Sequence, residues 1–180
     1  SYMRLSDLPG RMTAAAVVAG RYVAFKRRGM WVFQGGADPK NPLVRERFFA
    51  EFGCVGPRAL CVFEDVLYFV GESEIYKWKP GGVPEPICGD GMREAIMSRD
   101  ASVASWIEND TQTGLNQVIG VAVDEANRDL LTSTQSRIIY CMDLDGAGWS
   151  RLGAVGTVYV PRLTVPIWNP NTRHCYVAEE

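Results

Sequence analysis

The chain has 180 residues, with 19 Lys and Arg against 21 Asp and Glu, so its formal net charge is −2. This balance excludes a general nucleic-acid binder, because binding to a polyanion needs a surplus of positive side chains. Apolar residues make up 47% of the chain and charged residues 22%, a composition typical of globular domains that excludes a disordered chain. We therefore expect residues 1–180 to form one domain, or a fragment of one, with a packed core.

Membrane insertion and metal binding have little support in the sequence. The longest apolar stretch, residues 13–20, is far shorter than the about 20 residues that a helix needs to cross a bilayer. The five cysteines form no C-x-x-C pair, which disfavours a zinc site or a full set of disulfides. Their apolar neighbours indicate reduced thiols that act as small core side chains in a reducing compartment, and we expect no cofactor. They are Cys54, Cys61, Cys88, Cys141 and Cys175.

Short apolar runs, each ended by turn residues, predict β-hairpins along the whole chain. The first group of runs stops at Gly35-Gly36 and is followed by a Pro-rich loop over residues 37–42. Three further groups repeat the pattern. The predicted strands are residues 14–20, 22–25 and 30–33; 59–63, 66–70 and 75–78; 118–123, 129–133 and 138–143, with another at Trp149; and 163–168 and 176–178.

The spacing of these groups is typical of a β-propeller. The third strand of the first three groups begins at Met30, Ile75 and Ile138, which gives steps of 75 − 30 = 45 and 138 − 75 = 63 residues. A repeat of about 40 to 50 residues, each an antiparallel meander, is the signature of propeller blades. We predict an all-β chain with about three to four blades, which is an incomplete ring. A β-sandwich built from the same hairpins is the alternative.

The longer second step contains an insertion with helical composition. Residues 91–109 predict one or two short helices packed against the sheets. Asp100 is a candidate N-cap, and Val103, Trp106 and Ile107 fall on one face of the following turn. We expect Trp106 and Ile107 to face protein.

The last predicted hairpin is a candidate interface between chains. Its meander holds two strands, so apolar side chains and unpaired backbone groups would be exposed unless another chain or further blades cover them. We predict this interface at Val165, Ile167, Trp168 and Tyr176.

Three polar features are weaker candidates for a site. Lys26, Arg27 and Arg28 form the densest basic cluster; a solvated turn is the simpler interpretation, and a contact with an acidic neighbour or a channel lining is the alternative. His174 is the single histidine, and a structural role in a strand is favoured over catalysis. Residues 143–146 (DLDG) begin like a calcium loop but fit better a β-turn in which Asp145-Gly146 supplies positive φ.

Tryptophan recurs at comparable places in the first three groups. Trp31, Trp78 and Trp149 close or follow the third strands, so we expect them to be buried between neighbouring sheets. The alternative is a sugar- or ligand-binding propeller in which one aromatic ring of each blade stacks on a pyranose ring.

Several segments, taken in order, resemble a group of propeller-like virion structural proteins from the tails of tailed bacteriophages and prophages. The resemblance extends over residues 18–152. It rests on residues 21–35 (RYVAFKRRGMWVFQG), 52–59 (FGCVGPRA), 65–70 (DVLYFV), 74–78 (EIYKW), 120–129 (GVAVDEANRD), 138–144 (IIYCMDL) and 148–150 (GWS).

The resemblance implies a structural role rather than an enzymatic one. It implies a subunit of the tail or head-tail connection that acts by self-assembly and protein-protein contacts, repeated in a symmetric ring. The expected partners are further copies of the chain or other tail proteins. The expected location is the virion, assembled in the cytoplasm of the bacterial host, where a channel lining could lie near DNA without specific nucleic-acid binding. The resemblance brings no catalytic residue with it.

Overall fold

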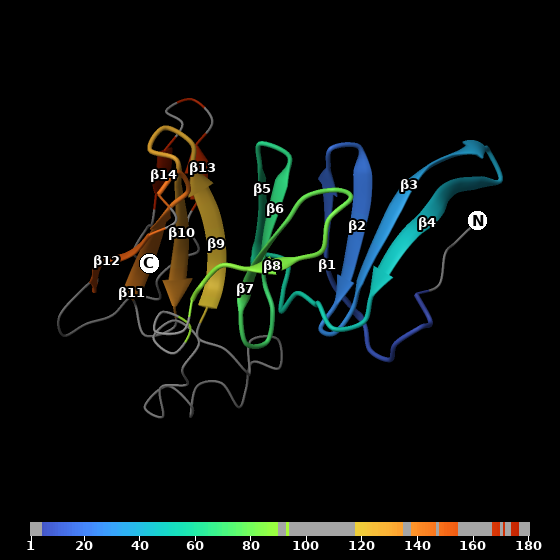
Figure 1. Ribbon diagram of the computed structural model, residues 1–180, viewed down its shortest axis with the longest axis horizontal. Helices are drawn as coiled ribbons and strands as arrows, with labels where there is room; N and C mark the ends of the chain where they lie inside the picture. The colour runs from blue at the N-terminus through green and yellow to red at the C-terminus, as the bar shows by residue number, and fades with distance from the viewer. Residues whose placement is uncertain are drawn as a thin grey trace.

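A computed structural model describes residues 5–89, 93, 118–134, 138–146, 148–154, 167–169, 171 and 174–176. These residues form antiparallel sheets joined by short turns, as the all-β prediction requires. Three sheets have four strands each and the last has two. Figure 1 shows the three four-stranded sheets side by side in chain order, with the two-stranded sheet next to the third of them.

The first sheet, here sheet 1, is a meander in which each strand pairs with the next along the chain. Its strands are β1 (Met12–Val18), β2 (Arg21–Lys26), β3 (Met30–Asp38) and β4 (Asn41–Phe49). Ala19 and Gly20, between β1 and β2, both have positive φ, 45° and 73°. This is the conformation of a tight hairpin turn whose twist matches that of the strands.

Sheets 2 and 3 repeat this meander. Sheet 2 contains β5 (Leu60–Phe63), β6 (Val66–Val70), β7 (Ile75–Trp78) and β8 (Glu85–Pro86). Sheet 3 contains β9 (Val118–Asp124), β10 (Asp129–Thr134), β11 (Ile138–Asp143) and β12 (Trp149–Ala154). The last hairpin pairs β13 (Ile167–Asn169) with β14 (His174–Tyr176).

The first strands of the meanders are neighbours in space. β1 packs against β5, β5 packs against β9, and β13 and β14 also contact β9. Sheets of a propeller are arranged in this way, with the first strand of each meander closest to a common axis. The strand order and these contacts make the arrangement propeller-like.

One apolar core runs through sheets 1, 2 and 3, and its aromatic contacts gather between sheets 1 and 2. Phe25 of β2 meets Phe69 of β6 with their ring centroids 4.9 Å apart, and Phe69 stacks on Tyr76 at 5.3 Å. Phe52, from the connection between the sheets, meets the edge of Tyr76 at 5.2 Å. Cys54 ties this connection to β1, because Thr13 Oγ1 donates a hydrogen bond of 2.6 Å to its carbonyl. The aromatic rings therefore join neighbouring sheets into one core.

The cysteines behave as the sequence predicts where their side chains are described. Cys54, Cys88 and Cys141 are buried, Cys61 is half-buried, and none of these four forms a disulfide bond. Burial raises the pKa of Cys54 and that of Cys88 to about 12, so both thiols stay neutral near pH 7.

The prediction of a loop over residues 37–42 is wrong. β3 continues through Gly35-Gly36 to Asp38, and β4 begins at Asn41, so these residues form the tip of a long hairpin. A Cβ atom on Gly36 would lie 2.5 Å from the carbonyl oxygen of Asn41, so glycine here permits close approach of the two strands. Pro42 is tolerated because β4 is the edge strand of its sheet.

The predicted helical insert, residues 91–109, lies outside the described residues except for Arg93. Arg93 is in a helical turn, and its backbone N–H donates a hydrogen bond of 2.9 Å to the carbonyl of Gly89. Asp100, Val103, Trp106 and Ile107 all fall in the part that is not described.

Candidate assembly interface

The two faces of sheet 1 have different environments. Side chains alternate across a strand, so Val23 and Phe25 point to one face while Tyr22 and Ala24 point to the other. The face toward sheet 2 is buried in the core. It carries Ala14, Val18, Val23, Phe25, Met30 and Val32.

The opposite face is apolar and open, and we name it the outer face. The strand register places Val17 opposite Tyr22, and Tyr22 opposite Phe33. Val17 is 57% exposed and Tyr22 is 47% exposed. Side chains of this face line an open hollow of about 480 Å³. The outer face consists of Ala15, Val17, Tyr22, Ala24, Phe33 and Leu43.

The N-terminal segment covers one end of this side of sheet 1. Residues 5–8, here the strap, lie over Lys26 and Trp31. The Lys26 ammonium group donates hydrogen bonds to the carbonyls of Leu5 and Leu8, and it lies 5.5 Å from the centroid of the Trp31 ring. Lys26 is 7% exposed. The buried cation is thus satisfied by two carbonyl oxygens and an aromatic face.

Asp7 fixes the middle of the strap. Its Oδ2 accepts a hydrogen bond of 2.9 Å from Trp31 Nε1, and both its oxygens lie 2.9 Å from Arg45 Nη1. The hydrogen bond from Trp31 and the contact with Arg45 lower the pKa of Asp7. Asp7 therefore keeps its negative charge at pH values lower than those at which an ordinary aspartate becomes protonated.

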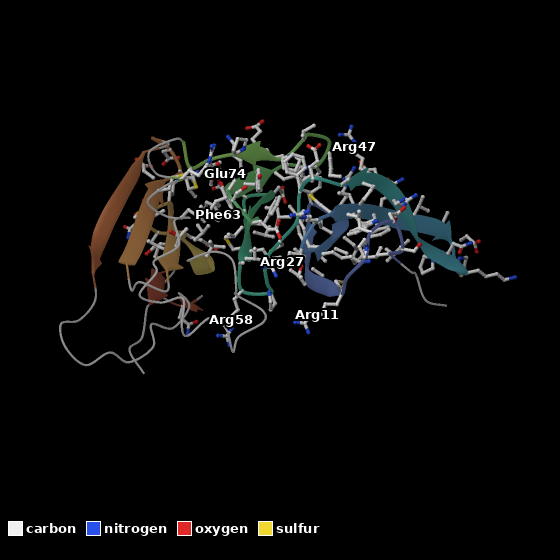
Figure 2. All side chains as sticks on the ribbon, turned by 90° about the horizontal axis from the view of Figure 1, so that it is seen from below. Arg11, Arg27, Arg47, Arg58, Phe63 and Glu74 are labelled. Carbon is white, nitrogen blue, oxygen red and sulfur yellow. The ribbon has the colours of Figure 1, made fainter. Side chains whose placement is uncertain are left out.

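The predicted basic cluster divides into two parts. Lys26 is buried beneath the strap and is not a solvated side chain, because residues more than fifteen positions away in the sequence supply its partners. Arg27 Nε and Arg28 Nε each lie 3.0 Å from a carboxylate oxygen of Glu72, in the turn between β6 and β7. Arg27 Nε is buried and lies close to Glu72, but the two groups are not aligned for a hydrogen bond. Figure 2 shows Arg27 between sheets 1 and 2.

A small polar hollow of about 340 Å³ surrounds these two arginines. Glu51, Glu72 and Tyr76 contribute to its lining together with backbone from Gly53 and Gly71. Glu72 already neutralises part of the positive charge of the arginines. The hollow is therefore a bridge between neighbouring sheets rather than a strongly charged binding site.

Glu74 is a buried carboxylate that the sequence did not single out. It is 3% exposed, and its Oε1 accepts hydrogen bonds from the backbone N–H groups of Ile75 at 2.8 Å and Cys88 at 3.1 Å. Its Oε2 accepts a hydrogen bond of 2.7 Å from Arg93 Nε. Glu74, labelled in Figure 2, therefore ties β7 to the chain that leaves sheet 2.

The predicted burial of the tryptophans is confirmed where they are described, but the predicted place between sheets holds for Trp78 and not for Trp31, which is buried beneath the strap. Trp31 is fully buried and Trp78 is 1% exposed, with Trp78 Nε1 donating to the carbonyl of Gly82 at 3.1 Å. Neither ring can stack on a sugar at the surface. Trp149 begins β12, but its side chain lies outside the described residues.

Residues 143–146 form a turn, as predicted, but for a different reason. Asp143 Oδ1 accepts a hydrogen bond of 2.8 Å from the backbone N–H of Asp145. Backbone N–H groups of Gly146 and Asp145 lower the pKa of Asp143. Gly146 does not adopt the left-handed conformation; a Cβ atom there would lie 2.7 Å from Asp143 Oδ2. A side chain at this position would therefore have to displace the Asp143 carboxylate.

The last hairpin contains most of the residues predicted as an interface. Ile167 pairs with Tyr176 and Trp168 with Cys175, while His174 pairs with Asn169. Val165 lies outside the described residues, as do the side chains of the paired positions.

The outer face of sheet 1 is an apolar surface that the sequence analysis did not predict. A signal for it exists, because the runs at residues 14–18 and 22–25 are apolar at successive positions rather than alternate ones. Such runs are typical of strands that are buried on both faces.

No protein-family model matches the chain, and no similar curated protein was found. Across the described ranges, no group of three or more His, Cys, Asp or Glu side chains is placed to hold a metal ion. No helix in this part of the chain is long and apolar enough to cross a membrane.

Proposed function

We propose that this chain is a structural subunit of a tailed-phage virion, in the tail or the head-tail connection, and that it acts by assembling with copies of itself. The observation that carries the proposal is the open apolar outer face of sheet 1. The order of hairpin motifs that resembles phage tail proteins supports the virion setting.

Neighbouring sheets in this chain pack against one another, and the outer face could be covered by a sheet in the same way. Sheet 1 packs on sheet 2, and sheet 2 packs on sheet 3, each through its first strand. Sheet 1 has a second apolar face, which carries Val17 and Tyr22 and has no sheet against it within the described residues. A sheet with two apolar faces is stable in water when both are covered, so the outer face would accept one more sheet.

The occupant that we propose is the last hairpin of the next copy. β13 and β14 lie against β9 of sheet 3, at the side of the molecule away from sheet 1 (Figure 1). Contact between sheet 1 of one copy and this hairpin of the next is head-to-tail. A repeated head-to-tail contact closes a ring when the rotations add up to a full turn, and otherwise it builds an open helical filament. The predicted interface residues Ile167, Trp168 and Tyr176 belong to this hairpin.

A sugar-binding module is the less supported function. The stacking platform that it needs was expected at the recurrent tryptophans, and Trp31 and Trp78 are both buried. The outer face is apolar, whereas pyranose recognition also needs polar side chains placed around the ring.

A matched pair of variants tests the assembly. Val17→Lys places a charge on the outer face, while Val83→Lys places the same charge at an equally exposed valine, 56% against 57%, away from that face. Sedimentation velocity should show oligomers for the wild type and for Val83→Lys, and monomers for Val17→Lys. A wild type that stays monomeric at all concentrations would contradict the proposal.

The virion setting needs a separate measurement. Mass spectrometry of purified phage particles, released from the bacterium that carries this sequence, should detect peptides of the chain in stoichiometric amounts. Their absence from intact particles would contradict the virion assignment while leaving self-assembly intact.

A further inference from the structure

The strap and the apolar hollow lie on the same face of sheet 1. Side chains alternate along a strand, so Lys26 of β2 points to the same face as Tyr22 and Ala24. The strand register places Trp31 opposite Ala24, at the border of the hollow. Leu5 of the strap lines the hollow itself. The strap therefore covers the part of this face that directly continues the proposed docking surface.

Without the strap, this part of the face would carry a solvated positive charge. The Lys26 ammonium group would lose the carbonyls of Leu5 and Leu8 and would bind water beside the Trp31 ring. A neighbouring copy that docks on the adjacent apolar side chains would have to strip this water from the ammonium group, which is unfavourable. An open strap therefore leaves a charge at the edge of the docking surface.

The closed strap removes this obstacle in two ways. It leaves Lys26 only 7% exposed, with two carbonyl oxygens as partners in place of water. It also brings the Leu5 side chain to the hollow, where Leu5 joins the exposed Val17 and Tyr22 in the lining. The surface that a neighbouring copy meets is thus more apolar when the strap is closed.

Side chains of sheet 1 hold the strap closed. Asp7 accepts a hydrogen bond of 2.9 Å from the neutral Trp31 indole on β3 and lies 2.9 Å from Arg45 Nη1 on β4, while β2 contributes the charge of Lys26. Gly10, between the strap and β1, has a φ of +95° and no atom within 4 Å of the position of a Cβ. Rotation at Gly10 would therefore carry the strap off the face without disturbing the core.

From these contacts we infer that the strap gates the assembly. When closed, it makes the outer face competent to dock the next copy, and when open, it exposes the Lys26 charge and prevents docking. Asp7 is the positioning residue that keeps the strap closed. The inference rests on the proposed self-assembly. Opening the strap has the same consequence as the Val17→Lys variant, because each places an ammonium group on or beside the outer face.

The test combines loss of Asp7 with removal of the covered charge. Asp7→Ala should speed hydrogen exchange of the Trp31 indole N–H, measured by NMR below the concentration of assembly, and should weaken assembly about tenfold in sedimentation velocity. Lys26→Met leaves no charge to cover, so adding Asp7→Ala to it should weaken assembly by less than about threefold. Asp38→Ala removes an exposed aspartate from the tip of the β3–β4 hairpin and is the control, which should assemble like the wild type.

Circular dichroism checks that each variant folds. If Asp7→Ala does not fold, Asp7→Asn replaces it, because asparagine keeps the size of the side chain and removes its charge. The inference is wrong if exchange at Trp31 is unchanged, if the strap opens and assembly is as strong as in the wild type or stronger, or if Asp7→Ala weakens assembly equally with and without Lys26. In these three cases self-assembly itself stands. A monomeric wild type would overturn the proposed function directly, and the gating with it.

Discussion

Arg128, in the turn after β9, reaches from sheet 3 to Glu64, in the turn after β5 of sheet 2. Its Nη2 lies 3.0 Å from Glu64 Oε2, while its Nε lies 3.0 Å from both oxygens of Asp145. The guanidinium carbon also lies 5.4 Å from the centroid of the Phe63 ring. Neighbouring sheets are therefore joined at their turns by charge as well as along their first strands by apolar packing.

Because Arg128 contacts Glu64, we expect the pKa of Glu64 to change when Arg128 is replaced. The hydrogen bond from Arg128 lowers the pKa of Glu64 below its ordinary value of 4.5. Stabilisation from this pair is therefore present above pH 4.5 and is lost as the pH falls through the lowered pKa. Arg128→Gln should return the pKa of Glu64 toward 4.5 in an NMR titration. An unchanged pKa would show that the two groups do not interact in solution.

Trp78→Ala should destabilise the chain strongly. The ring is 1% exposed in the core, so its removal should lower the free energy of unfolding by about 3 to 5 kcal/mol in urea titrations. Val83→Ala, at an exposed position nearby, is the control and should change it by less than about 0.5 kcal/mol. A small effect of Trp78→Ala would mean that the core between sheets is not packed as described.

Glu74 should matter more for stability than a surface carboxylate. Glu74→Ala leaves the backbone N–H groups of Ile75 and Cys88 without their acceptor, which should cost about 3 kcal/mol of unfolding free energy. Arg93→Ala removes a half-exposed partner and should cost less than about 1 kcal/mol. Equal losses in the two variants, measured by urea unfolding, would contradict the anchoring role of the backbone contacts.

Cysteine reactivity should follow burial. Because burial raises the pKa of Cys54 to about 12, its thiol is protonated at pH 8 and its thiolate forms only at much higher pH. Iodoacetamide at pH 8 should therefore modify half-buried Cys61 well before Cys54, as followed by peptide mass spectrometry. Faster labelling of Cys54 would indicate that the connection between sheets 1 and 2 opens in solution.

Hairpin periodicity was sufficient to predict most of the strands. The predicted starts at Met30, Ile75 and Ile138 coincide with those of β3, β7 and β11, because apolar runs and turn residues are local signals. β4 was missed because Gly36 and Pro42 mark turns in most sequences. Here one glycine permits close strand approach and the proline lies on an edge strand.

The candidate site was harder to predict because it depends on contacts between distant parts of the chain. Lys26 resembles any solvated turn lysine until the strap, about twenty residues earlier, is placed over it. The solvent exposure of Val17 and Tyr22 likewise depends on which faces of sheet 1 are covered by other sheets, and this is decided by the packing of distant segments. The interface predicted at the last hairpin concerns contacts with another chain and stays a prediction.

Photo-cross-linking from Tyr22 tests head-to-tail assembly most directly. Tyr22 is an exposed aromatic residue of the outer face, so a benzophenone amino acid can replace it with little disturbance of the core. Equal amounts of light and heavy isotope-labelled chains are mixed, and the cross-linked peptides are identified by mass spectrometry. The proposal predicts mixed light-heavy adducts between position 22 and residues 167–176. Adducts confined to single chains, or intermolecular adducts that avoid the last hairpin, would contradict it.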